Sequence, residues 1–119
     1  MRKIASCHCG AVSIEVADYP SEVTDCNCSL CRSYGVLWAY YDVSDLALPS
    51  DGSLTDTYAW NGRHVDFHRC SRCGCVTHWV PRNLRRKRRG INARLLPPEV
   101  LAAARLRHLD GASSGKYLD

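Results

Sequence analysis

The segment Cys70-Ser71-Arg72-Cys73-Gly74 decides the fold that this sequence is expected to adopt. A C-x-x-C segment folds back on itself and presents two thiolates to one metal ion, and the glycine after it takes positive φ without steric cost. Much earlier in the chain, Cys7 and Cys9 are two residues apart, so their side chains point the same way in an extended segment. Two such pairs complete a tetrahedral zinc site. We therefore predict a structural zinc ion held by Cys7, Cys9, Cys70 and Cys73.

A third group of cysteines lies in Cys26-Asn27-Cys28-Ser29-Leu30-Cys31 and offers three thiolates without an evident fourth ligand. Structural zinc sites are closed by four protein ligands, whereas functional sites leave one position open. An open position suits an external thiol, which zinc holds as thiolate at neutral pH. The group is interpreted as a second zinc site formed by Cys26, Cys28 and Cys31. A shared or regulatory cluster and a Cys28–Cys31 redox pair are the alternatives.

The eight cysteines in a chain of 119 residues also bear on its compartment. Such a density would suit a disulfide framework in a short secreted protein. The first residues, however, include no apolar stretch of signal-peptide length, and no run is long enough to span a membrane. We therefore expect a cytoplasmic protein without membrane association, one domain over 1–119, with metal ligation in place of disulfides. The eighth cysteine, Cys75, is interpreted as a small buried apolar residue.

The remaining sequence predicts a mostly β fold of many short strands. Residues 11–17 alternate between apolar and polar, and Asn61-Gly62 between two strand-like runs is a strong hairpin signal. A helix is expected from Pro98, since proline and an acidic residue are favoured in a first turn. The expected strands cover 11–17, 36–41, 54–60, 63–68, 76–80, 91–96 and 105–109, with a charged loop from 82 to 90 and one short C-terminal helix.

Basic charge is concentrated in one segment. Six of the sixteen basic residues lie within 82–89, which leaves ten basic and twelve acidic residues, a net charge of −2, for the rest of a chain whose total is +4. The segment is interpreted as a solvated loop. Binding of nucleic-acid phosphates and attraction of an anionic peptide thiol such as glutathione are the alternatives. Aromatic residues do not interleave with the basic ones, which argues against stacking of single-stranded bases.

The three cysteine motifs, in their order and spacing, resemble the glutathione-dependent formaldehyde-activating enzyme family, which also includes centromere protein V. The resemblance implies packed antiparallel sheets like those of the type B methionine sulfoxide reductases. It also implies two zinc ions per chain, one structural on Cys7, Cys9, Cys70 and Cys73 and one functional on Cys26, Cys28 and Cys31.

The activity implied by the resemblance is that of a carbon–sulfur lyase, formation of S-hydroxymethylglutathione from formaldehyde and glutathione. The glutathione sulfur, held as thiolate at the open zinc position, would attack the formaldehyde carbon. The chain is shorter than the founding enzymes, has Cys75 where threonine is common, and lacks an aromatic residue just before Lys116. The alternative function is a non-enzymatic zinc module that binds nucleic acid or a protein partner through 82–89.

Overall fold

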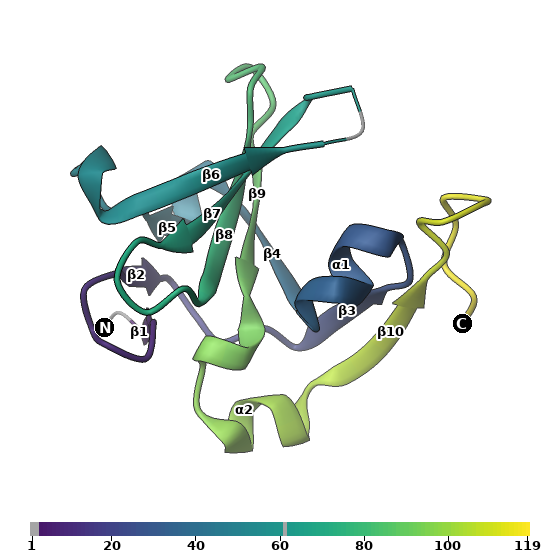
Figure 1. The fold of residues 1–119 in the computed structure, drawn as a ribbon. Helices are drawn as coiled ribbons and strands as arrows, with labels where there is room; N and C mark the ends of the chain where they lie inside the picture. Colours follow the sequence, from purple (N-terminus) through teal and green to yellow (C-terminus); the bar gives the residue numbers. More distant parts are fainter. Residues whose placement is uncertain (1–2, 61) are drawn as a thin grey trace.

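The computed structural model describes residues 3–60 and 62–119 and consists mainly of β-strands in two sheets (Figure 1). The three-stranded sheet has the order β1–β2–β5, with β1 at Lys3–Ser6, β2 at Ser13–Val16 and β5 at Leu46–Ala47. The seven-stranded sheet has the order β10–β3–β4–β9–β8–β7–β6. Its strands are β3 (Glu22–Cys26), β4 (Trp38–Asp42), β6 (Thr55–Ala59), β7 (Val65–Cys70), β8 (Val76–Pro81), β9 (Arg88–Asn92) and β10 (Arg105–Leu109).

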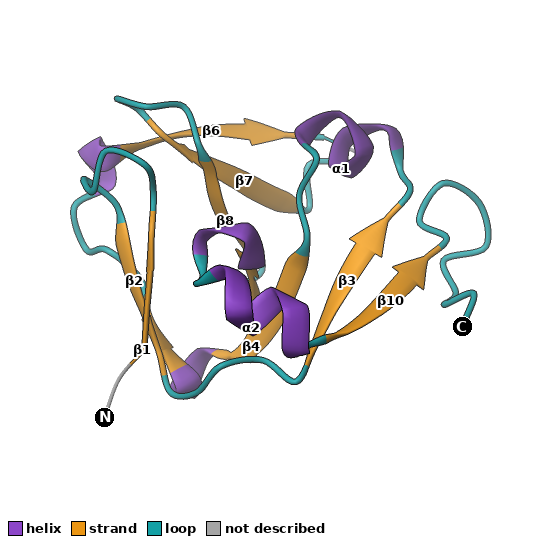
Figure 2. Cartoon of the chain, turned by 90° about the horizontal axis from the view of Figure 1, so that it is seen from below, coloured by secondary structure: helices purple, strands orange, loops and turns teal. Residues whose placement is uncertain are grey.

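Two short α-helices, α1 (Ser29–Tyr34) and α2 (Pro98–Ala103), lie among the strands (Figure 2). Three 3-10 turns complete the described elements, at Val43–Asp45, Gly52–Leu54 and Ala93–Leu95. As the sequence predicts, α2 begins at a proline and has Glu99 in its first turn. Within the described part of the chain, neither helix is long and apolar enough to cross a membrane.

The main core lies between the two sheets. Val12, Ile14 and Val16 are each 0% exposed, which confirms the alternation seen in the sequence. They belong to one cluster with Ala39 of β4 and Ile91 of β9, on the facing sheet. Burial of such side chains contributes about 1.5–3 kcal/mol each. The cluster also contains two cysteines of the predicted four-cysteine site, so that site is part of the core.

The β6–β7 hairpin is confirmed, with antiparallel pairs from Thr55↔Cys70 to Ala59↔Asp66. The connection between the two strands therefore covers residues 60–64, and Gly62 adopts positive φ within it. Asn61, the first residue of the predicted Asn-Gly turn, lies outside the described residues.

The structure corrects the expected location of the last central strand. Residues 82–90 were expected to form a loop and 91–96 a strand. Instead, β9 begins at Arg88 and ends at Asn92, and a 3-10 turn occupies Ala93–Leu95. The run of charged residues indicates a solvated loop, so the strand is not apparent from the sequence. In the fold, however, its arginines have partners that allow them to lie in a strand. Arg88 lies over the Tyr40 ring at 3.9 Å, and the 6%-exposed Arg89 donates to the Arg86 carbonyl at 2.6 Å.

Two further features differ from the expected antiparallel fold with one helix. Strand β10 runs parallel to β3, from Arg105↔Glu22 to Leu109↔Cys26. Alternation over five residues predicts a strand but does not specify its partner. Helix α1 is the second difference, because six residues are too few to show helical periodicity.

Candidate metal centres

The four cysteines predicted to hold a structural zinc ion lie together. The Sγ atoms of Cys7, Cys9, Cys70 and Cys73 are all within 4.8 Å of one another. Those of Cys7 and Cys9 are 3.7 Å apart, and those of Cys9 and Cys70 are 3.6 Å apart. Sulfurs at the corners of a tetrahedron with Zn–S bonds of about 2.3 Å would be about 3.8 Å apart. The donor set and its spacing therefore fit zinc without rearrangement of the chain.

The turn after β7 has the shape that the C-x-x-C sequence requires. Gly74 has φ of +79°, and its N–H donates to the carbonyl of Cys70 at 2.9 Å. The N–H of Cys70 in turn donates to the carbonyl of Cys75 at 2.9 Å. These bonds return the chain to β8 and leave Cys70 and Cys73 facing the segment that follows β1.

Backbone donors favour a thiolate at Cys73, whereas burial opposes charge in this group and the pKa of Cys9 is raised to about 11. Cys7 and Cys70 are only 3% and 1% exposed, so an unpaired charge on them would be costly. The backbone N–H groups of Cys75 and Cys9 lower the pKa of Cys73 to about 5. Thiolates are the form that binds metal, and a cation would compensate the charge of these sulfurs.

The other three cysteines of the N-terminal half form a second, smaller group. The Sγ atoms of Cys26, Cys28 and Cys31 lie within 4.8 Å of one another, and no fourth His, Cys, Asp or Glu of the described residues joins them. Cys26 ends β3, Cys28 is the N-cap of α1 and Cys31 lies in the first turn of that helix. The Cys31 N–H donates to the Cys28 Sγ at 3.3 Å. The short helix thus sets the spacing of the three thiols.

The thiols of the second group differ in pKa. The Cys31 thiol bonds to Cys26, which lowers the pKa of Cys26 to about 6 and raises that of Cys31. The buried indole N–H of Trp38 donates to the Cys31 Sγ at 3.3 Å. Three thiols with 6%, 8% and 7% exposure therefore sit beside hydrogen-bond donors that support ligand charge.

All eight cysteines are free in the structure. Cys75 is partly buried and packs against the main core. Its side chain is not in either three- or four-sulfur group, so the interpretation as a small apolar residue fits its surroundings.

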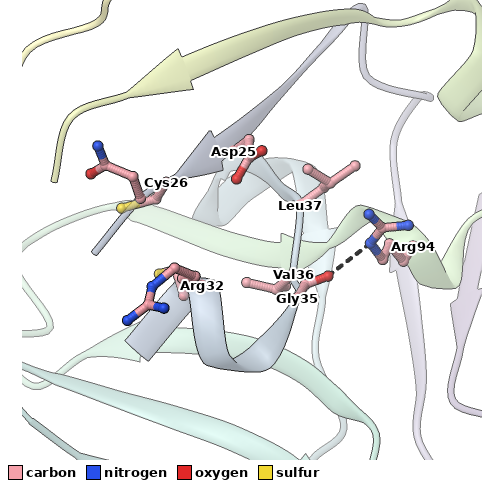
Figure 3. A pocket seen from close by; sticks show the side chains of 9 residues that line it. Asp25, Cys26, Arg32, Gly35, Val36, Leu37 and Arg94 are labelled. Carbon is pink, nitrogen blue, oxygen red and sulfur yellow. Dashed lines mark hydrogen bonds between the residues drawn. The ribbon is translucent and has the colours of Figure 1, made fainter. Parts of the chain in front are cut away.

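Two hollows adjoin the second group. The first has a volume of about 360 Å³, and Figure 3 shows Cys26, Arg32 and Arg94 around it. The Arg94 Nε donates to the carbonyl of Gly35 at 2.8 Å and so holds the C-terminal end of α1. The second hollow, of about 270 Å³, is called here the thiol pocket; it is lined by Cys26, Cys28, Trp60, His64, Val65, Phe67 and Gly111.

Three histidines near the cysteine groups in sequence or space occupy different places. His68 and His78 stack at 4.2 Å with an interplanar angle of 13°, in facing positions of β7 and β8. Desolvation lowers the pKa of both, that of His78 to about 3, so both are neutral at physiological pH. Neither lines a hollow next to the second cysteine group, whereas His64 lines the thiol pocket.

Gly111 is a site residue that sequence reasoning missed. Its backbone N–H bonds to Cys26, and a Cβ atom at this position would lie 2.5 Å from the Cys26 Sγ. The loop that carries it is fastened to the cysteine segment, since Asn27 Nδ2 donates to Asp110 Oδ1 at 3.1 Å and Ala112 N–H donates to Asn27 Oδ1 at 2.9 Å. The local sequence indicates only a turn, because the partner is distant in the chain.

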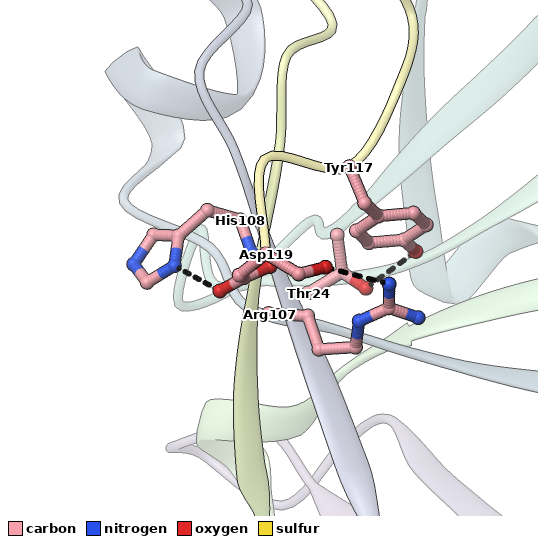
Figure 4. Close-up of polar contacts among 5 residues, drawn as sticks. All are labelled: Thr24, Arg107, His108, Tyr117 and Asp119. Carbon is pink, nitrogen blue, oxygen red and sulfur yellow. Dashed lines mark hydrogen bonds and ion pairs between the residues drawn. The ribbon is translucent and has the colours of Figure 1, made fainter.

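The last residues are held against β3 and β10 (Figure 4). The hydroxyls of Tyr117 and Thr24 are 2.9 Å apart, and the Arg107 guanidinium lies 3.8 Å from the centroid of the Tyr117 ring. Asp119 Oδ2 accepts from His108 Nδ1 at 2.8 Å. These contacts, with the parallel pairing of β10 to β3, place the C-terminal loop over Cys26.

Replacing Gly111 by alanine is expected to weaken metal binding at the second group about tenfold or more, since outer-shell changes have effects of this size. The added methyl would displace the Cys26 sulfur from its neighbours. Competition with a chromogenic chelator measures the affinity of the weaker metal site. Gly52→Ala is the matched control, because a Cβ atom there meets nothing within 4 Å. Equal affinities in the two variants would contradict the role given to Gly111.

Comparison with known proteins agrees with the cysteine pattern. A family model described as glutathione-dependent formaldehyde-activating enzyme matches residues 2–97. A crystal structure of a protein from Rhodobacter sphaeroides is similar with a TM-score of 0.69 and 30% sequence identity, over 89% of this chain and 99% of that one. Both cysteine groups lie within the matched residues, whereas β10 and Gly111 lie beyond them.

Proposed function

This chain belongs to the glutathione-dependent formaldehyde-activating enzyme family, and from that membership we propose that it is a zinc-dependent protein that binds a small thiol, with glutathione the best candidate. The proposed reaction is the addition of the thiol to formaldehyde to give S-hydroxymethylglutathione, the activity of a carbon–sulfur lyase. Cys7, Cys9, Cys70 and Cys73 would hold a structural zinc ion. Cys26, Cys28 and Cys31 would hold a second one.

The observation that carries this proposal is the three-thiol group without a fourth ligand among the described residues, beside the thiol pocket. A zinc ion on these three cysteines would supply an open position at which a thiol sulfur binds as thiolate at neutral pH. Trp38 orients Cys31 through its 3.3 Å bond to the sulfur. The apolar side chains of Trp60 and Phe67 reduce the water around the bound nucleophile.

The proposed addition reaction needs few further catalytic groups from the protein. The thiolate sulfur forms one bond to the formaldehyde carbon, the carbonyl π pair becomes an alkoxide, and the alkoxide takes from solvent the proton that the thiol released. No other reactant is needed, and positioning of the two substrates is the main contribution of the pocket. We further propose a single cytoplasmic domain over 1–119 with a fold related to that of the type B methionine sulfoxide reductases.

The alternative of nucleic-acid binding through 82–89 is less well supported by the side chains. Arg82 is paired with Asp66 at 2.9 Å, Arg88 lies over Tyr40, and Arg89 is buried. Three of the six basic side chains are therefore engaged within the fold, which leaves fewer of them to contact the phosphates of a nucleic acid.

Titration of the zinc-loaded protein with glutathione and with a short DNA duplex, each at two salt concentrations, separates the two functions. We expect saturable glutathione binding, and an accelerated exchange between ¹³C-formaldehyde and its glutathione adduct, measured by NMR with catalytic amounts of protein. Salt-sensitive DNA binding without thiol binding would overturn the proposal. Thiol binding without acceleration would reduce the function to that of a binder.

A further inference from the structure

A cationic cleft lies next to the thiol pocket. It has a volume of about 360 Å³, is called here the arginine cleft, and is lined by Arg63, His64, Arg82, Asn83 and Arg86. We infer that this cleft binds a carboxylate of the same molecule whose thiol enters the thiol pocket, and so selects anionic peptide thiols over neutral ones. The inference rests on the proposed function and adds the recognition of the substrate's charged end.

The two spaces are neighbours, because one residue lines both of them. His64 lines both of them, directly before β7. The next residues, Val65 and Phe67, face the thiol pocket from alternate positions of that strand. Figure 1 shows the β6–β7 connection and the β8–β9 loop at the same end of the seven-stranded sheet. The N–H of Arg82 donates to the carbonyl of His64 at 2.9 Å and joins the two segments.

The arginine cleft carries uncompensated positive charge. Arg82 forms two contacts with Asp66 Oδ1, at 3.0 Å through Nε and 2.9 Å through Nη2, so that pair is neutral. Arg63 and Arg86 have no ion pair within the described residues. The cleft therefore has a net charge of about +2, and two guanidinium groups are free to form bidentate bonds to a carboxylate.

The backbone on both sides of the cleft is constrained. Arg63 adopts φ of +57°, and it is the only non-glycine residue with positive φ in the described part of the chain. Such a conformation is costly and persists where surrounding structure imposes it, often at ligand sites. On the other side, Asn83 organises the loop: its Oδ1 accepts from Arg85 N–H at 3.1 Å and its carbonyl accepts from Arg86 N–H at 3.0 Å. Both arginines thus start from fixed backbone positions.

The ligand class follows from the two adjoining spaces. One end of the ligand must be a thiol that reaches Cys26 and Cys28, and the other must be an anion that reaches Arg63 and Arg86. A peptide of three residues spans about 10 Å when extended, which is long enough to lie across two neighbouring hollows. A small neutral thiol such as 2-mercaptoethanol would occupy the thiol pocket alone.

The test compares two double variants of the zinc-loaded protein that remove the same charge from the same region. Arg63→Gln/Arg86→Gln changes the arginine cleft, whereas Arg85→Gln/Lys87→Gln changes neighbouring cations that do not line it. Dissociation constants are measured by calorimetry for glutathione, for 2-mercaptoethanol and for S-methylglutathione, which keeps the carboxylates but has no thiol. Circular dichroism and zinc content establish that both variants are folded.

We expect Arg63→Gln/Arg86→Gln to weaken glutathione binding about tenfold or more, since two charge-assisted contacts are lost, and to leave 2-mercaptoethanol binding unchanged. The control should change glutathione binding less than about threefold, because only a screened field is lost. Equal losses in both variants, or no loss in either, would overturn the inference while the proposed function stands. If S-methylglutathione binds in an arginine-dependent way and glutathione binds no more tightly than S-methylglutathione does, the result would support carboxylate binding in the arginine cleft and contradict the proposed thiol site.

Discussion

Replacement of Cys73 by alanine is expected to prevent stable folding of this protein. The four-sulfur group lies partly within the main core and joins the segment after β1 to the turn between β7 and β8. Structural zinc in small peptides contributes about 10–16 kcal/mol at pH 7. The whole net stability of a domain is about 5–15 kcal/mol. Loss of one ligand would thus remove an amount comparable to the total.

Circular dichroism, chemical denaturation and zinc content measure this effect, and strong chelation of the native protein should reproduce it. Cys75→Ala is the matched control, because Cys75 is in the same turn region but outside the four-sulfur group. We expect that control to fold, retain its zinc and lose about 1 kcal/mol, as for a typical substitution. A cooperatively folding, metal-free Cys73→Ala protein would refute the structural zinc site.

Replacement of Cys31 by alanine should instead reduce the zinc content from two ions per chain to one and leave the fold intact. Two remaining thiols are too few for a stable zinc site. The second group packs in its own smaller cluster, with Val36 and Trp38, and is separate from the core between the sheets. Binding of glutathione should be lost together with the second ion, because the open position would no longer exist.

Zinc content by mass spectrometry of the metal and thermal unfolding provide the two readouts. Ser33→Ala is the control on the same helix, since Ser33 is exposed and its hydroxyl donates to the carbonyl of Ser29, at 2.6 Å. That variant should retain two ions. A native protein with a single zinc ion would show that Cys26, Cys28 and Cys31 hold none, and an unfolded Cys31→Ala protein would contradict the separation of the two sites.

The Cys7/Cys9 pair, the Cys70/Cys73 pair and the Cys26/Cys28/Cys31 triplet could each be recognised from local spacing alone. Cys70 and Cys73 specify a turn that Gly74 completes, and the structure has that turn with the expected positive φ. The alternation of Val12, Ile14 and Val16 likewise predicted which face of β2 is buried. In each case the property depends on residues within a few positions of one another, so that short-range geometry suffices.

Other features depended on partners far apart in the chain. The sequence placed Arg88 and Arg89 in a loop. In the structure they belong to β9, where Arg88 lies over the Tyr40 ring and Arg89 donates to the Arg86 carbonyl. The parallel pairing of β10 with β3 could not be read from its five residues. Asn92, Arg94 and Tyr117 belong to none of the sequence motifs, but in the structure their side chains bind the Val76 carbonyl, the Gly35 carbonyl and the Thr24 hydroxyl, respectively.

The sequence by itself determined the set of possible metal ligands and the family: seven of the eight cysteines have spacings that suit zinc, and the family model matches 2–97. Only the tertiary structure decided what surrounds the second group, Cys26, Cys28 and Cys31. Gly111 reaches Cys26 because β10 lies along β3, and the arginine cleft adjoins the thiol pocket because β7 and β8 bring two loops together. Ligand spacing is a local property of the chain, whereas the walls of a pocket come from segments that only folding brings together.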